Sequence, residues 1–168
     1  YRGTDRIIEV ANLFNNKILK KLKFIVVGDI KIPNGAKNKL KHLRPFNDLK
    51  EYTKAKGLSG SFLFLGHVVD VENILVHLDL TLKLTREYNP WGRDILESMF
   101  YSVPVVSIGK YDVFIKDKYT GILLQKYNPQ VIANEIISLY QNKSNLLQMK
   151  KNSKKTILDE CNPKKNSE

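Results

Sequence analysis

The segment from residue 86 to residue 97 holds the side chains best suited to chemistry. Within a few positions it gathers basic, acidic and amide side chains with a tryptophan and a glycine, namely Arg86, Glu87, Asn89, Trp91, Gly92, Arg93 and Asp94. Gly92 would let a ligand approach the backbone closely, the N–H groups of a following helix would attract an anion, and Arg93 could bind a phosphate through two parallel hydrogen bonds. Glu97 follows about one helical turn later, where its carboxylate can accept hydrogen bonds from both hydroxyls of a ribose. The segment predicts a nucleotide site, and it leaves open the alternative of a capped helix with surface ion pairs.

Other familiar catalytic arrangements are missing from the sequence. His42, His67 and His77 do not have the spacing of metal ligands, and His67 is expected to be a hydrogen-bonded turn residue. Asp94 is expected to face the helix dipole and Trp91 to pack against the sheet edge, in place of roles in acid catalysis or base stacking. The sequence also lacks the carboxylate pair of glycosidases, a Ser/His/Asp arrangement and a Walker-type loop. It therefore predicts no catalytic residue, no metal site and no cofactor.

Short apolar runs separated by helical patterns define the elements that must position this segment. Strands are predicted at residues 23–29, 61–66, 80–84, 104–109 and 120–124, and helices at 4–16, 40–56, 71–78, 93–101, 130–141 and 145–160, with a loop at 30–37. Such alternation predicts an α/β fold with a doubly wound parallel sheet, in which ligands bind beyond the carboxyl ends of the strands. The loops after Gly28, Gly66 and Gly109 and the segment at 86–94 are expected at that edge.

Length and composition limit the organisation of the chain. Its 168 residues, 42% of them apolar, suffice for one core, so we expect a single domain at residues 1–160 and a polar tail at 161–168. The only cysteine, Cys161, excludes an intrachain disulfide and fits a reducing, cytoplasmic setting. The apolar runs are much shorter than the roughly 20 residues that span a bilayer. The start at Tyr1, without a methionine or a signal-peptide pattern, is expected to be a cut edge.

Four motifs in a fixed order carry a family resemblance. They are Gly66-His67-Val68, the run NPWGRDILESM at residues 89–99, Pro104-Val105-Val106 and Thr120-Gly121-Ile122-Leu123, preceded by Arg2-Gly3. Together they resemble the C-terminal, donor-binding domain of the group 1 (family 4) retaining glycosyltransferases. Those enzymes have the GT-B architecture of two Rossmann-like domains. The resemblance covers nearly the whole chain and implies that the first strand of the domain lies upstream of Tyr1.

The resemblance implies a role for several residues. Arg2 matches a basic residue that contacts the donor diphosphate, and the backbone around Gly66, His67 and Val68 matches the segment that holds the nucleobase. Glu97 matches the ribose-binding glutamate, while Gly92 and the amides after it, with Arg93, match the pyrophosphate and sugar side. The sequence departs from the family at Asn89, where a glutamate often binds the donor sugar, and at Ser102, where a glycine is common.

The implied activity is hexosyl transfer, in glycan biosynthesis, from a nucleotide diphosphate-sugar with retention and without a metal. The acceptor would be held by an N-terminal GT-B domain of the same parent chain, so the isolated chain is expected to be inactive. Peripheral contact with the inner face of a membrane fits a lipid-linked acceptor, and no nucleic acid is expected as a partner. The competing hypothesis is a noncatalytic basic module that binds RNA or an anionic membrane, favoured by the net charge of +11 and by the pairs Lys150-Lys151, Lys154-Lys155 and Lys164-Lys165. That module would bind any polyanion in a salt-sensitive way.

Overall fold

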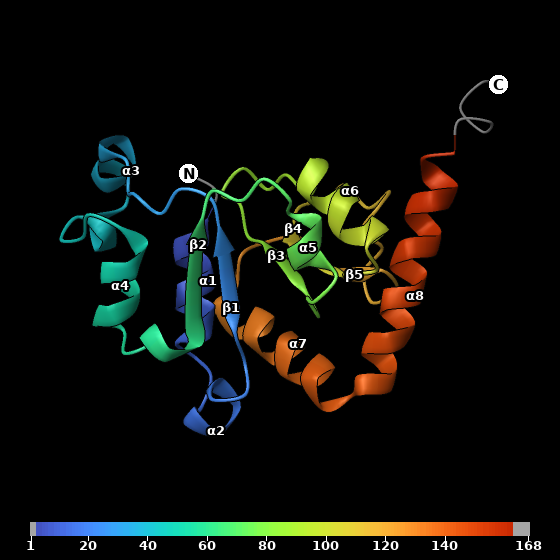
Figure 1. Cartoon of the computed structure of the whole chain (residues 1–168), viewed down its shortest axis with the longest axis horizontal. Coiled ribbons are helices and arrows are strands. Elements are labelled where there is room, and N and C mark those ends of the chain that lie inside the picture. The colour runs from blue at the N-terminus through green and yellow to red at the C-terminus, as the bar shows by residue number, and fades with distance from the viewer. Residues whose placement is uncertain (1–2, 163–168) are drawn as a thin grey trace. The chain divides into compact units, whose positions relative to one another are not determined.

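The computed structural model describes residues 3–162, and Arg2 therefore lies outside the described residues. The chain divides into two compact units, one comprising Gly3–Val69 and the other beginning at Asp70. Figure 1 shows the elements of both units along the chain. Each unit is described by itself below.

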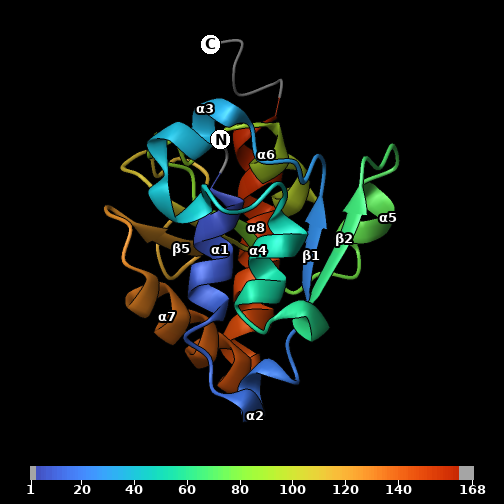
Figure 2. The same ribbon diagram turned by 90° about the vertical axis from the view of Figure 1, so that its left-hand side faces the viewer.

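The first unit builds a two-stranded parallel sheet with helices. Its elements are α1 (Thr4–Ala11), α2 (Asn16–Leu19), β1 (Phe24–Val27), α3 (Asn34–Lys39), α4 (Leu49–Ala55) and β2 (Phe62–Gly66), with short 3-10 helices at Lys41–Leu43 and Ser59–Ser61. β1 pairs with β2 in parallel, with Phe24 opposite Phe62. The two rings stack at 4.8 Å on the buried face, and α1 and α4 lie together on one side of the strands (Figure 2).

The second unit builds a three-stranded parallel sheet. Its elements are α5 (Glu72–Leu75), β3 (Thr81–Lys83), α6 (Arg93–Phe100), β4 (Val105–Ile108), β5 (Gly121–Leu124), α7 (Pro129–Gln141) and α8 (Lys143–Glu160). The strand order is β3-β4-β5, and all four residues of the central strand β4 are buried. Side chains from α6, β4, the segment before β5 and α8 form one apolar cluster, made of Ile95, Met99, Val105, Phe114, Ile115 and Ile157.

The predicted strands all form, and helix capping explains where several helices begin. Asn128 accepts hydrogen bonds from the N–H groups of Gln130 and Val131, which starts α7 at Pro129 as predicted. Asp48 does the same for α4 by accepting from the N–H of Glu51, so the helix predicted at 40–56 is regular only from Leu49. The loop predicted at 30–37 is partly wrong, because α3 begins at Asn34 directly after Pro33.

Both sheets are parallel and flanked by helices, which confirms the predicted Rossmann-like α/β class. The five strands are hydrogen-bonded as two ladders rather than one, with β1 and β2 in the first and β3 to β5 in the second. The strand expected upstream of Tyr1 and the single domain at 1–160 stay predictions. Among residues 3–162, no helix has both the length and the hydropathy that a bilayer crossing requires.

Candidate functional site

The segment before α6 is fixed against the end of the neighbouring strand β4. Gly109, directly after β4, has φ 149°, and a Cβ built on it would lie 2.5 Å from the carbonyl oxygen of Tyr88 and still closer to the ring of Pro90. The loop that follows β3 therefore lies against the backbone at the end of β4. This contact confirms that the two loops meet at one edge of the sheet in the second unit.

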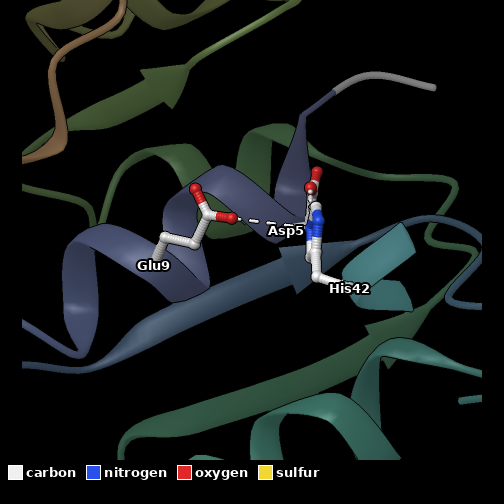
Figure 3. Close-up of side chains that lie close together, drawn as sticks. All are labelled: Asp5, Glu9 and His42. Atoms are coloured by element: carbon white, nitrogen blue, oxygen red, sulfur yellow. Dashed lines mark hydrogen bonds and ion pairs between the residues drawn. The ribbon is translucent and has the colours of Figure 1, made fainter. Parts of the chain in front are cut away.

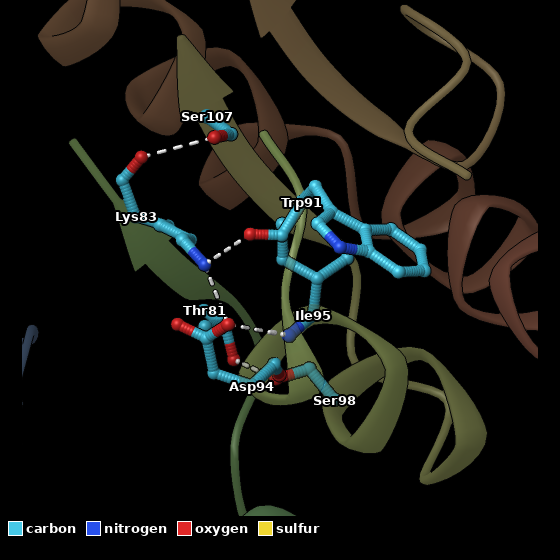
Figure 4. A network of polar contacts seen from close by, with 7 residues as sticks. All are labelled: Thr81, Lys83, Trp91, Asp94, Ile95, Ser98 and Ser107. Atoms are coloured by element: carbon cyan, nitrogen blue, oxygen red, sulfur yellow. Dashed lines mark hydrogen bonds and ion pairs between the residues drawn. The ribbon is translucent and has the colours of Figure 1, made fainter. Parts of the chain in front are cut away.

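A lysine on β3 holds the same segment from the other side (Figure 4). The Nζ of Lys83 donates hydrogen bonds to the backbone carbonyl of Trp91 at 2.7 Å and to Oδ1 of Asp94 at 2.6 Å. The side chain of Lys83 is only 14% exposed. Lys83 was not among the predicted site residues. Its signal in the sequence is a charged residue within the strand, two positions after Thr81, which places both on one face of β3.

Thr81 on β3 adds a second polar connection to the first turns of α6. The hydroxyls of Thr81 and Ser98 lie 2.9 Å apart, and Ser98 donates to the backbone carbonyl of Asp94 at 2.7 Å. Asp94 is in the first turn of α6, where its carboxylate is stabilised by the helix dipole, as predicted. β3 thus fixes the start of α6 through two side chains on one of its faces.

Gly92 lies between these contacts. It precedes α6 with φ 144°, a backbone conformation that favours glycine, and a Cβ built on it would lie 2.7 Å from Nζ of Lys83 and 2.8 Å from Oδ1 of Asp94. The backbone conformation therefore favours glycine, and a Cβ would also have to displace the ends of the Lys83 and Asp94 side chains. The sequence had identified Gly92 for a different reason, the close approach of a ligand that a glycine permits.

The predicted phosphate and ribose ligands contact each other. Nε of Arg93 donates to Oε1 of Glu97 at 2.5 Å, in an i,i+4 pair whose side chains are 90% and 35% exposed. The hydrogen bond to Glu97, together with the charge of that carboxylate, raises the pKa of Arg93 above its ordinary value. Asn89 is exposed on the preceding loop. The pair is a surface ion pair of the kind that the sequence left open as an alternative.

Trp91 packs against aromatic side chains of the segment between β4 and β5, whereas the sequence predicted packing against the sheet edge. Its ring stacks on that of Phe114 with 5.0 Å between centroids and meets Tyr111 edge-on at 5.9 Å. The residue nevertheless remains 45% exposed. An aromatic surface therefore borders Gly92.

The residues predicted to hold the nucleobase belong to the first unit. Gly66 ends β2 with φ 70°, and its carbonyl accepts a hydrogen bond from Gly28 at 2.6 Å. His67 is exposed and Val68 is half-buried. That residues 66–68 and residues 89–97 form one site stays a prediction. The contact of Arg2 with the donor diphosphate also stays a prediction.

The structure also brings together three side chains that the sequence did not connect (Figure 3). Nε2 of His42 lies 3.0 Å from Oδ2 of Asp5 and 3.5 Å from Oε1 of Glu9, and the Asp5 side chain is fully buried. One imidazole nitrogen and two carboxylate oxygens could hold a divalent cation, and without a cation the imidazole still gives the buried carboxylate a hydrogen-bond partner. Burial raises the pKa of the adjacent Tyr52 to about 12, and the charges of Glu9 and Asp5 act in the same direction.

Several solved structures share this fold. HepE from Anabaena in complex with UDP matches with a TM-score of 0.76 and 21% identity, over 95% of this chain and 41% of HepE. The C-terminal domain of a group 1 family glycosyl transferase (LpcC) from Francisella tularensis matches with a TM-score of 0.73 and 21% identity, over 94% of this chain and 78% of that domain. A variant of TarM from S. aureus, solved with UDP, matches with a TM-score of 0.75 and 22% identity, over 94% of this chain and 30% of TarM. This chain therefore spans less than half the length of HepE and TarM.

No curated protein sequence matches the chain significantly. The family model for the group 1 glycosyl transferases, in contrast, matches residues 1–156. The matching residues include both parallel sheets, the segment held by Lys83 and Gly109, and all of α6. The match extends over most of the 168 residues, and the chain therefore belongs to the group 1 glycosyl transferase family.

Proposed function

We propose that this chain binds the nucleotide diphosphate-sugar donor of a retaining glycosyltransferase, whose acceptor is held by another domain. The observation that carries the proposal is the fixed segment between β3 and α6, which places Gly92, Arg93 and Glu97 at the carboxyl edge of a parallel sheet. The neighbours HepE and TarM were solved with UDP, and HepE also with UDP-glucose, which supports a diphosphate nucleotide as the ligand.

Each group at this edge has a chemical task in the proposal. Negative charge develops on the leaving diphosphate during transfer, so N–H groups at the start of α6 and the cations Arg93 and Arg2 would stabilise it without a metal. Glu97 would exchange its contact with Arg93 for the two ribose hydroxyls. Asn89 would bind hydroxyls of the sugar, and the backbone at Gly66 to Val68 would hold the base.

The first test is selective diphosphate binding. Trp91 is the only tryptophan of the chain and adjoins Gly92, so its fluorescence should change when a nucleotide binds there. We expect one of UDP, GDP and ADP to bind more tightly than the corresponding monophosphate, and we expect no sugar transfer by the chain alone. Titration of Trp91 emission, confirmed by calorimetry and a donor-turnover assay, measures both. Equal, strongly salt-dependent binding of heparin, RNA and all nucleotides would instead favour the basic-module hypothesis.

The second test concerns Glu97. Glu97→Ala is expected to weaken nucleotide binding by about 2 kcal/mol, because charge-assisted hydrogen bonds to the ribose are lost. The melting temperature should stay close to that of the unchanged protein, since the Glu97 side chain is partly exposed. Glu72→Ala, on the exposed surface of α5, is the control and should bind normally. A large loss of stability in Glu97→Ala with normal binding would make Glu97 a structural residue.

A further inference from the structure

Lys83 is a nearly buried cation whose two hydrogen bonds lie on either side of Gly92. It contacts the carbonyl of Trp91, one residue before Gly92, and the carboxylate of Asp94, two residues after it. Lysine is seldom buried unless its charge is paired, and here Asp94 supplies the pairing. These two hydrogen bonds constrain the backbone from Trp91 to Asp94.

The contact with Trp91 determines how the next peptide group is oriented. The carbonyl of Trp91 and the N–H of Gly92 belong to the same peptide group, and no described residue has a cis peptide bond. In a planar trans peptide the C=O and N–H bonds point in opposite directions. Because the Trp91 carbonyl points at Nζ of Lys83, the Gly92 N–H points away from Lys83 and β3.

Lys83 also changes the charge next to the start of α6. Without it, the Asp94 carboxylate would be left beside Gly92 without the ammonium that lies 2.6 Å away. An unpaired carboxylate at that place would repel a diphosphate. Lys83 could therefore favour an anionic ligand through backbone orientation, through neutralisation of Asp94, or through both.

We propose that Lys83 is a positioning residue for the donor, which turns the Gly92 N–H outward as a hydrogen-bond donor to the diphosphate-sugar. The inference rests on the proposed function, because it assigns the ligand to that same site. In this arrangement the orientation of a backbone N–H donor, that of Gly92, depends on the side chain of Lys83 on β3. Lys83 lies outside the motif at residues 89–99 and outside the Arg93–Glu97 pair.

Three variants of the chain separate orientation from charge. Lys83→Met removes the contact with Trp91 and should weaken binding of the preferred nucleoside diphosphate about tenfold or more. Lys83→Arg retains a cation that can reach the carbonyl and should recover part of the affinity. Lys83→Met combined with Asp94→Asn removes the repulsion but not the misorientation, so binding should remain weak. Full recovery in this double variant would overturn the orienting role.

A ligand-free measurement keeps this test separate from that of the proposed function. The amide resonance of Gly92 should shift in Lys83→Met and stay in place in Lys83→Arg, and acrylamide should quench Trp91 more strongly in Lys83→Met. Lys155→Met, on the exposed surface of α8, removes the same charge elsewhere and should change none of these properties. If the unchanged chain binds no diphosphate, the proposed function fails. An unchanged Gly92 resonance in Lys83→Met overturns the positioning role whatever the chain binds.

Discussion

Gly121→Ala is expected to reduce the free energy of unfolding by about 4 kcal/mol, because the added methyl group has no space between two paired strands. Gly121 begins β5 opposite Val105 of β4, and a Cβ built on it would lie well inside 3.0 Å of the Val105 carbonyl oxygen and 3.0 Å from Cγ2 of Ile115. A backbone carbonyl in a sheet cannot move aside as a flexible side chain can. Urea denaturation, monitored by circular dichroism and Trp91 fluorescence, measures the change.

Gly60→Ala is the matched control for this substitution. A Cβ at Gly60 meets no atom within 4 Å, and Gly60 does not have positive φ. Its stability should stay within about 1 kcal/mol of the unchanged chain. Equal stability of the Gly121 and Gly60 variants would show that β4 and β5 do not pair in the register described.

Gly109→Ala is expected to reduce both stability and nucleotide binding. Its φ of 149° is unfavourable for alanine, and the new methyl group would push Tyr88 and Pro90 away from the end of β4. We expect a loss of about 3 kcal/mol in the free energy of unfolding, together with a change in Trp91 emission, since Trp91 follows Pro90 directly. The same urea titration, followed by a nucleotide titration of the folded variant, measures both effects.

Gly35→Ala controls for the general cost of replacing a glycine. Gly35 lies in α3 and a Cβ there meets no atom within 4 Å, so alanine should be neutral or stabilise the helix by up to about 1 kcal/mol. A Gly109 variant that denatures at the same urea concentration as the unchanged chain would mean that residues 88–90 do not lie against β4.

Local patterns were sufficient for the elements and for the family. Apolar runs that end in glycine predicted β1, β2 and β4, and Asn128-Pro129 predicted the start of α7, because strand formation and helix capping depend on neighbouring residues. Four motifs in a fixed order, preceded by Arg2-Gly3, together resembled the group 1 glycosyl transferases, and the family match confirms that family. The same reasoning failed at α3, where Pro33 starts a helix that the sequence presented as a loop.

The candidate site shows what local patterns miss. The sequence located Gly92, Arg93 and Glu97 in one short segment and left a surface ion pair open there, but it did not reveal that Lys83 holds the backbone between Trp91 and Asp94. On the sequence alone Lys83 was one of the 28 basic residues, without an assigned partner.

The sequence by itself thus determined the class of fold, the family and the segment in which to look for the site. The tertiary structure decided which side chains meet there. Lys83 reaches Asp94, eleven positions later, because β3 runs beside the start of α6, and His42 reaches Asp5 across 37 positions. Periodicity and motifs report on residues within a few positions of each other, whereas these contacts depend on which segments the fold brings side by side.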